Sequence, residues 1–478
     1  MNKFQSFCYN SLKIFIGIAL ILILISGFGK INFGVNSDFD FMLLSLIGIS
    51  GIGGFIIINL NINTKLKMCF LLIIALLLRL WWIFNVNSVP VSDFNTMYLA
   101  AKELLKGNYE IFRDFGYLAR FPHLVCTSLY MALMIIIFPV SHLFAIKIVN
   151  IVLSVISLIL LYKLSDYFLR HEKVKLGIIL LGALFPAFIA YSSTYCTENI
   201  AIPLFLGTLL LFMDAQKTND IGKWILCGIV LSLSNLFRAV GIVFLIAFII
   251  FIFVFTNEKK FRNVTALTFS MIITSATVSL FLISVGVIQR PLWSGSEPSF
   301  ATLMLKGTNV ENGGRWNLED AQFVDANLGN KDLAKMCIEK ATHRISKLSV
   351  KEKILFFGQK FISQWSVGDF SGTYWAFLDS GTELKYVLPP VFQVIFIITI
   401  FLGFLSLLSK EKLKNSAILY ILLCGFGIVF MILETQSRYS YICSWIFVIL
   451  AVSGIEYIIK LSGRVKNAKF FSRNNKRT

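Results

Sequence analysis

Long apolar runs constrain this chain more than any other feature of its sequence. Several segments are apolar for about 18 to 22 residues, which at about 1.5 Å per residue is enough to cross a hydrocarbon core of about 30 Å. Hydrophobic residues make up 57% of the 478 residues and charged residues only 15%, whereas soluble proteins have about 25% charged residues. Lipid offers the backbone no hydrogen-bond partners, so these segments must be helices. The sequence therefore predicts an all-α polytopic membrane protein.

The apolar runs give the expected spans, and the basic residues between them give the orientation. Lys and Arg gather in short loops and in the tail from Lys460 to Thr478, as is typical of cytoplasmic segments. All these clusters fall on one side only if the apolar segment 122–139 begins and ends outside. We therefore expect twelve crossings, both termini in the cytoplasm and 122–139 in the interface; the alternative is a thirteenth crossing by 122–139. The twelve expected spans are 11–29, 40–60, 67–86, 142–162, 176–192, 197–214, 224–236, 238–255, 264–288, 387–408, 415–432 and 440–460.

The net charge of +18 follows from this loop pattern and does not indicate a nucleic-acid partner. The eight cysteines lie mostly in or beside apolar spans and form no CxxC pair, which indicates small buried hydrophobic residues rather than a disulfide framework or metal site. The four histidines show no paired spacing, so no metal site is predicted from them. The run 11–29 lacks a small-residue cleavage site and is expected to be a retained signal anchor.

The polar segments between the spans divide the chain into five expected regions. From 318 to 365 the composition is helical, so two or three short helices are expected on the membrane surface within the longer of two external segments. The regions are 1–63 with two extra N-terminal transmembrane helices, 64–289 with the main transmembrane module and its first external loop at 87–121, 290–386 with an external loop domain, 387–460 with the C-terminal transmembrane helices, and 461–478 as a basic cytoplasmic tail.

Ionisable residues beside membrane spans are candidates for function, because such groups cost about 2.5 to 3.5 kcal/mol at the centre of a spanning helix. The expected topology places a set of them, from separate parts of the sequence, together at the external face. Carboxylates beside guanidinium groups would suit a site where an acid or base works next to a phosphate. The candidates are Asp93 and Tyr98, Arg120, Glu198, Arg238, and Glu434 with Arg438 and Tyr439.

Each candidate also has a structural interpretation. Asp93 and Glu198 precede helical segments and could cap them. The arginines at 120, 238 and 438 could anchor the protein at lipid headgroups. Arg79 lies close to Trp81 and Trp82, so we interpret it as an interfacial anchor.

The order of these motifs resembles a known family. Arg79 precedes Ser92, Asp93, Tyr98 and Ala100, then Leu104 and Gly107, Arg120 and Pro122, Thr197 to Asn199, and finally Glu434, Arg438 and Tyr439. This order resembles the GT-C glycosyltransferases, and within them the protein mannosyltransferase and aminoarabinose transferase branch, also called glycosyltransferase family 39. The resemblance covers about 67 to 460 and leaves the first two spans outside the common module.

The resemblance implies a GT-C fold of twelve or thirteen transmembrane helices, with interfacial helices at 94–106 and 122–139 in the first loop. It implies a polyprenyl-phosphate-linked sugar as donor and Asp93 as the base that activates an acceptor hydroxyl. Arg120 would contact the carrier phosphate, although one proline and then His123 follow it where the family has a Pro-Pro pair. The acceptor would be a glycan, lipid or protein of the cell envelope. No cofactor is implied, and a divalent cation stays an open alternative.

The expected mechanism is a single inverting displacement. A positioned carboxylate contributes typically about 10² to 10⁴ in rate, and a phosphate leaving group is stabilised when arginine meets its charge. We expect Asp93 to act as base, Arg438, Arg120 and Arg238 to hold the donor phosphate, and Glu198, Glu434, Tyr98 and Tyr439 to support them. No GxGxxG or GxxxxGK[ST] fingerprint stands between a strand and a helix, which agrees with a lipid-carried donor.

Two alternatives stay open from the sequence. A transporter or flippase for lipid-linked sugars would line a path through the membrane with polar residues, and an O-antigen ligase or polymerase would place key arginines in large outer loops. The clustering of charges at one face favours the transferase. Aromatic residues at the surface could contact the acceptor or belong to the interfacial belt; these are Trp316, Trp365, Tyr374 and Trp375.

Overall fold

The computed structural model describes residues 1–29, 37–256, 258–365, 373–377, 389–411 and 413–474, the last twelve of these by their backbone alone. Parts of the expected loop domain (366–372 and 378–386), the first residues of the span 387–408 and the end of the basic tail lie outside the described residues. Within the described residues every regular element is a helix, and several helices are apolar and long enough for a multi-pass membrane protein. The predicted fold class is confirmed.

Each of the twelve expected spans corresponds to apolar helical structure. In the described part of the chain, eight of these spans are helices long and apolar enough to cross a membrane, one is a bent pair of helices, and three are shorter helices. The eight are α1 (Lys3–Phe28), α2 (Asp38–Asn59), α3 (Thr64–Asn85), α7 (His142–Ser165), α10 (Glu198–Thr218), α13 (Lys260–Ser284), α21 (Ala417–Ile432, after η4, Lys414–Ser416) and α22 (Trp445–Asn474). The shorter helices are α11 (Ile221–Phe237), α12 (Gly241–Phe255) and α20 (Pro390–Ser406), and the bent one is α8 (Glu172–Leu184) with α9 (Pro186–Ala190) and η3 (Tyr191–Ser193).

Arg79 is a buried structural residue and not the interfacial anchor expected from its neighbours Trp81 and Trp82. Its side chain is 0% exposed. Pro186 has no N–H group, so the carbonyl of Gly182 lacks its helical donor, and the chain bends by 56° between α8 and α9. The Arg79 guanidinium donates to the Gly182 carbonyl at 3.2 Å and to Ser154 Oγ at 2.8 Å. The interfacial interpretation is wrong because Arg79 is buried and supplies the hydrogen bond that the Gly182 carbonyl of α8 lacks at the bend.

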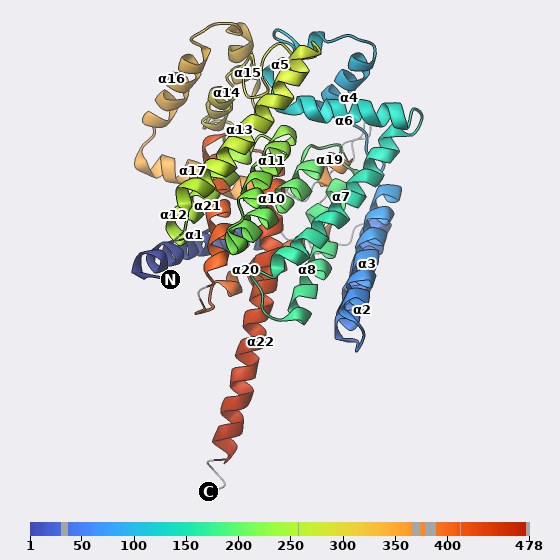
Figure 1. The fold of residues 1–478 in the computed structure, drawn as a ribbon, viewed down its shortest axis with the longest axis vertical. Coiled ribbons are helices and arrows are strands. Elements are labelled where there is room, and N and C mark those ends of the chain that lie inside the picture. Colours follow the sequence, from blue (N-terminus) through green and yellow to red (C-terminus); the bar gives the residue numbers. More distant parts are fainter. Residues whose placement is uncertain (30–36, 257, 366–372, 378–388, 412, 475–478) are drawn as a thin grey trace.

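The segment 122–139 forms a short helix at one end of the bundle. It consists of η2 (Pro122–Leu124) and α6 (Val125–Ile137), and α6 runs across the direction of α3 and α7 (Figure 1). It is bent by 110° from the preceding stretch Glu110–Arg120, and its 13 residues give a length of about 20 Å, shorter than a hydrocarbon core of about 30 Å. Both features agree with the predicted interfacial position.

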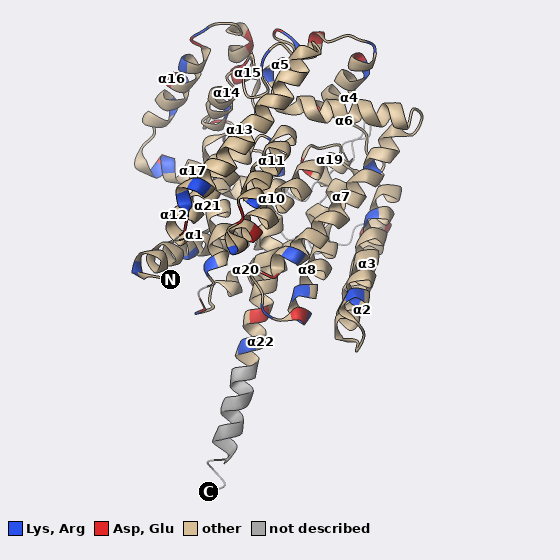
Figure 2. Cartoon of the chain, viewed as in Figure 1, with Lys and Arg blue, Asp and Glu red and all other residues tan. Residues whose placement is uncertain are grey.

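Basic loops that are distant in the sequence meet at the opposite end, where the lower end of α8 lies beside α22 (Figure 2). Arg170 Nη2 lies 3.5 Å from Glu411 Oε2, and Lys460 Nζ lies 3.1 Å from the same oxygen. Lys175 Nζ lies 2.6 Å from Asp166 Oδ1. These pairs join three of the loops that the charge pattern places in the cytoplasm, so the loops share one end of the molecule as that pattern requires.

Four helices follow α13 and form a small layer on the bundle. We call them the loop helices: α14 (Ser299–Gly307), α15 (Leu318–Ala326), α16 (Leu333–Ser346) and α17 (Val350–Trp365). Their own apolar core includes Ala301, Leu305, Val324, Leu333 and Cys337. Three of them lie within the stretch expected to be helical, and α14 is an addition that its Gly- and Asn-rich surroundings concealed. The short helix α19 (Thr373–Phe377) returns the chain to the bundle.

Candidate active site

Asp93 lies in the first turn of α4 (Ser92–Leu105) and does not act as the helix cap. The cap residue is Val91, which makes no side-chain cap hydrogen bond. Phe94 and Met97 bury one face of α4 in the core, while the Asp93 side chain is 42% exposed. Its Oδ1 accepts a hydrogen bond from Tyr117 Oη at 2.6 Å, so Tyr117 fixes one oxygen and leaves Oδ2 facing the site.

Arg438 faces that second oxygen. It lies in η5 (Ser437–Cys443), between α21 and α22, and its Nη2 is 3.8 Å from Asp93 Oδ2. The guanidinium carbon lies 4.8 Å from the ring centroid of Phe94 and 4.7 Å from that of Trp375, so aromatic faces hold the cation in place. Arg438 is 3% exposed, yet its Nε and Nη1 have no hydrogen-bond partner among the described residues. A buried guanidinium with open donors is ready to bind an anion.

Glu198 and Arg238 form a second ion pair beside the first. Glu198 begins α10, and Arg238 directly follows α11; Arg238 Nη2 is 3.4 Å from Glu198 Oε1. The Tyr439 ring lies between the two arginines, with its centroid 4.8 Å from the Arg238 guanidinium carbon and 5.7 Å from that of Arg438. The structure therefore brings together residues that the sequence separates by more than 300 positions.

Glu434 adds a third carboxyl group close to this cluster. It follows the end of α21 and is 6% exposed. Burial raises the pKa of Glu434, and the negative charge of Asp93 acts in the same direction, while Lys306 and Arg438 oppose the shift. Glu434 therefore belongs to the electrostatic surroundings of both Asp93 and Arg438.

Tyr98 lies outside the cluster. It is on α4, more than one turn after Asp93, and its Oη lies 2.7 Å from His142 Nε2. The Lys102 ammonium lies 4.3 Å from the centre of the Tyr98 ring. These contacts join α4 to the start of α7, so Tyr98 supports the site only by fixing α4.

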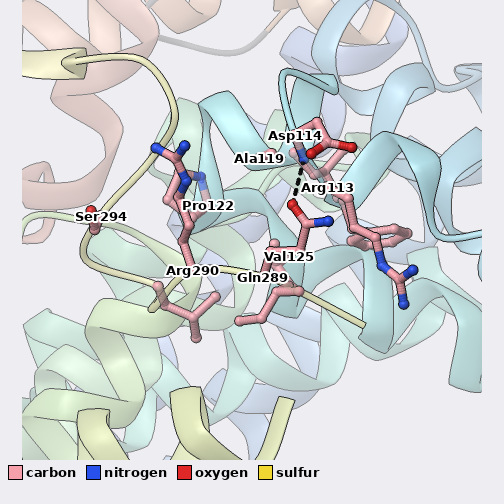
Figure 3. Close-up of a pocket in the computed structure, with 12 residues that line it drawn as sticks. Arg113, Asp114, Ala119, Pro122, Val125, Gln289, Arg290 and Ser294 are labelled. Atoms are coloured by element: carbon pink, nitrogen blue, oxygen red, sulfur yellow. Dashed lines mark hydrogen bonds between the residues drawn. The ribbon is translucent and has the colours of Figure 1, made fainter. Parts of the chain in front are cut away.

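Arg120 points toward the loop helices. It ends α5 (Tyr117–Arg120), and its guanidinium donates to Glu297 Oε2 at 2.8 Å and to Asp325 Oδ1 at 2.8 Å. The same region holds other contacts between the first loop and the segment after α13, including the bond from the Asp114 amide to Gln289 Oε1 at 3.1 Å (Figure 3). These contacts fasten α5 to Glu297 and to α15. Phosphate binding by Arg120 stays a prediction.

Tyr117 and His123 were not among the predicted site residues. Burial raises the pKa of Tyr117, and the Asp93 carboxylate raises it further, so the hydroxyl stays protonated and donates. Burial lowers the pKa of His123 to about 4, with Arg238 acting in the same direction and Asp93 and Glu198 opposing it. A tyrosine in a loop and a histidine after a proline carry no spacing signal, so only the folded arrangement reveals them.

One comparison with known proteins finds a family match for part of the chain. Residues 121–285 match the family model described as dolichyl-phosphate-mannose-protein mannosyltransferase. This match supports a membrane glycosyltransferase of the GT-C type. The match covers about a third of the chain and contains Glu198 and Arg238, but not Asp93 or Arg438. No curated protein matches the chain significantly.

The matched part of the chain supplies one of the two ion pairs, and the flanking parts supply the other. Among the described residues, no three His, Cys, Asp or Glu side chains are grouped so that they could hold a metal ion. Beside the two ion pairs, the site holds the carboxyl group of Glu434 and the ring of Tyr439 between the two arginines.

Proposed function

We propose that the protein transfers a sugar from a polyprenyl-phosphate carrier to an acceptor hydroxyl, with inversion at the anomeric carbon. The observation that carries this proposal is Arg438, whose buried guanidinium has two donors without partners in the described residues and lies 3.8 Å from a carboxylate. Adjacent N–H groups of one guanidinium suit the paired oxygens of a phosphate.

In the proposed reaction Asp93 Oδ2 takes the proton of the acceptor hydroxyl. The hydroxyl oxygen then forms a bond to the anomeric carbon as the bond from that carbon to the phosphate oxygen breaks. The carrier leaves as polyprenyl phosphate, and Arg438 stabilises the charge that develops on it. The hydroxyl oxygen attacks opposite the departing phosphate and no carboxylate bonds to the anomeric carbon, so the configuration inverts, unlike in the two-step reaction of retaining hydrolases.

Arg238 has a secondary role in this proposal. Its charge is partly met by Glu198 at 3.4 Å, so it attracts the donor phosphate less strongly than Arg438 does. Glu198 and the Tyr439 ring hold Arg238 at a fixed distance from the cluster. We place the site on the outer face of the cell membrane, because the basic loops meet at the other end of the molecule.

The test of this proposal is a transfer assay with purified Asp93→Asn. Wild-type protein is incubated with a panel of polyprenyl-phosphate sugars, and release of the free carrier phosphate is measured. Asparagine keeps the shape of the side chain but cannot accept the proton, so we expect release to fall by about 10² to 10⁴ with the productive donor. Asp114→Asn, at an exposed turn residue of the same loop with a positive φ of 50° that asparagine tolerates, should keep full activity. Full activity in Asp93→Asn would refute the assignment of the base.

A further inference from the structure

Helix α17 is fastened to the segment that carries Arg438. Gln364, near the end of α17, is 1% exposed. Its Nε2 donates to the Gln436 carbonyl at 2.8 Å and to Ser440 Oγ at 2.9 Å, and its Oε1 accepts from the Gln436 amide at 3.1 Å. Ser440 Oγ in turn donates to the Gln364 carbonyl at 2.9 Å. One side chain thus pairs with both backbone groups of Gln436.

These contacts bracket Arg438. Gln436 precedes it by two residues and Ser440 follows it by two, so Gln364 fixes the chain on both sides of the arginine. Arg438 lies in η5, and the hydrogen-bond geometry of a 3-10 helix is poorer than that of an α-helix. Hydrogen bonds from outside η5 are therefore needed to fix its conformation.

A second side chain of α17 holds the segment further upstream. Lys360 lies one turn before Gln364 on the same face and is 1% exposed. Its Nζ donates to the Leu433 carbonyl at 2.6 Å and to the Gly307 carbonyl at 2.5 Å. The segment from 433 to 440 is thus fastened to α17 at both ends, so a shift of α17 would move the whole segment.

We infer that Gln364 is a positioning residue that sets the Arg438 guanidinium against the phosphate of the lipid-linked donor. This inference rests on the proposed function and adds that the loop helices control the strength of phosphate binding. Without the Gln364 amide, the Gln436 backbone and Ser440 Oγ lose these three hydrogen bonds, and the chain on both sides of Arg438 is held less firmly. A displacement of about 1 Å from a productive position can cost about 10²-fold in rate.

The test is binding of farnesyl phosphate and of farnesol to the full-length protein, measured with the protein in detergent. Farnesol has the same chain without the phosphate, so the ratio of the two affinities reports phosphate recognition and not general integrity. Gln364→Met keeps the side-chain volume and removes all three hydrogen bonds. We expect it to weaken farnesyl phosphate binding about tenfold and to leave farnesol binding unchanged.

The matched control is Gln359→Met, the same exchange at an exposed position of the same helix, which should change neither affinity. Ser440→Ala removes the two hydrogen bonds between the Ser440 hydroxyl and Gln364 with a smaller disturbance of packing, and it should weaken farnesyl phosphate binding about threefold. It keeps the inference testable if Gln364→Met folds poorly. In an Arg438→Gln background, Gln364→Met should cause no further loss, because it acts through the arginine.

Two results would overturn different statements. If folded Gln364→Met and Ser440→Ala both bind farnesyl phosphate as tightly as wild type, the positioning role of Gln364 is wrong and the proposed function stands. If wild-type protein shows no preference for farnesyl phosphate over farnesol, phosphate recognition itself fails, and the proposed function fails with it.

Discussion

Two pairs of arginine and aspartate in this molecule, each with one buried member, are built in opposite ways. In the loop helices, Arg344 donates to both oxygens of Asp320, from Nη1 at 2.9 Å and from Nη2 at 2.7 Å. At the candidate site, Arg438 approaches Asp93 with one nitrogen at 3.8 Å. The first pair has the fork geometry that makes such contacts strong; the second leaves most of its hydrogen-bonding capacity unused.

The surroundings extend this contrast. Asp320 also accepts from Asn309 at 3.1 Å and from Asn317 at 3.0 Å, and its side chain is 0% exposed. Burial raises its pKa, but the bonds from Arg344, Asn317 and Asn309 outweigh burial and lower the pKa of Asp320 to about 2. Arg438 has no such partners for Nε and Nη1 in the described residues. We call Arg344 with Asp320 the closed pair and Arg438 with Asp93 the open pair. The closed pair has its hydrogen bonds satisfied and stabilises the fold, whereas the open pair has room for a ligand.

The largest expected effect comes from removing the open pair. In Arg438→Gln the neutral amide cannot meet the charge on the leaving phosphate, so we expect kcat/KM for carrier release to fall about 10² to 10³-fold. The melting temperature should change little, because two of the lost donors have no protein partner. Arg290→Gln, at an exposed arginine of the segment after α13, is the control and should behave as wild type. A loss smaller than threefold in Arg438→Gln would show that the open donors do not serve the reaction.

The closed pair should respond in the opposite sense. Among the described residues, Asp320→Asn leaves the Arg344 charge with only the exposed Glu319 carboxylate, 3.6 Å from its Nη2, and breaking a buried pair costs about 3 to 5 kcal/mol. We expect faster limited proteolysis of the loop helices at Asp320→Asn and nearly normal turnover per folded molecule. Asp332→Asn, at an exposed position before α16, should not change the cleavage rate. Normal protease resistance of Asp320→Asn would contradict the structural role.

Acid should weaken the closed pair in the wild-type protein. The pKa of Asp320 is lowered from 3.8 to about 2 in the folded state, so its contribution to stability is fully present above about pH 4 and is lost as the pH falls toward 2. Protease sensitivity of the loop helices should therefore rise over this interval, and Asp320→Asn should show less of this acid dependence.

The sequence predicted what depends on local pattern. Hydropathy predicted the apolar helices. The positions of the basic loops predicted that Asp93, Arg438 and the pair of Glu198 with Arg238 lie together at the opposite end of the bundle. The sequence could not predict contacts between distant segments. Arg79 pairs with a carbonyl 103 positions away, and Arg120 with carboxylates 177 and 205 positions away. No motif or spacing in the sequence indicates any of these partners.

The smallest expected effect tests how the open carboxylate is oriented. Tyr117→Phe removes the hydrogen bond of 2.6 Å to Asp93 Oδ1, and a bond to a charged group contributes about 1.5 to 3 kcal/mol. Because the Asp93 charge and its access to the acceptor remain, we expect kcat to fall about tenfold and farnesyl phosphate binding to stay unchanged. Tyr109→Phe, in the same loop, keeps the ring that lies against Arg113 and should not lower kcat. Weaker farnesyl phosphate binding in Tyr117→Phe would mean that Tyr117 places Arg438 as well as Asp93, and the division of labour between the two charged residues would have to be redrawn.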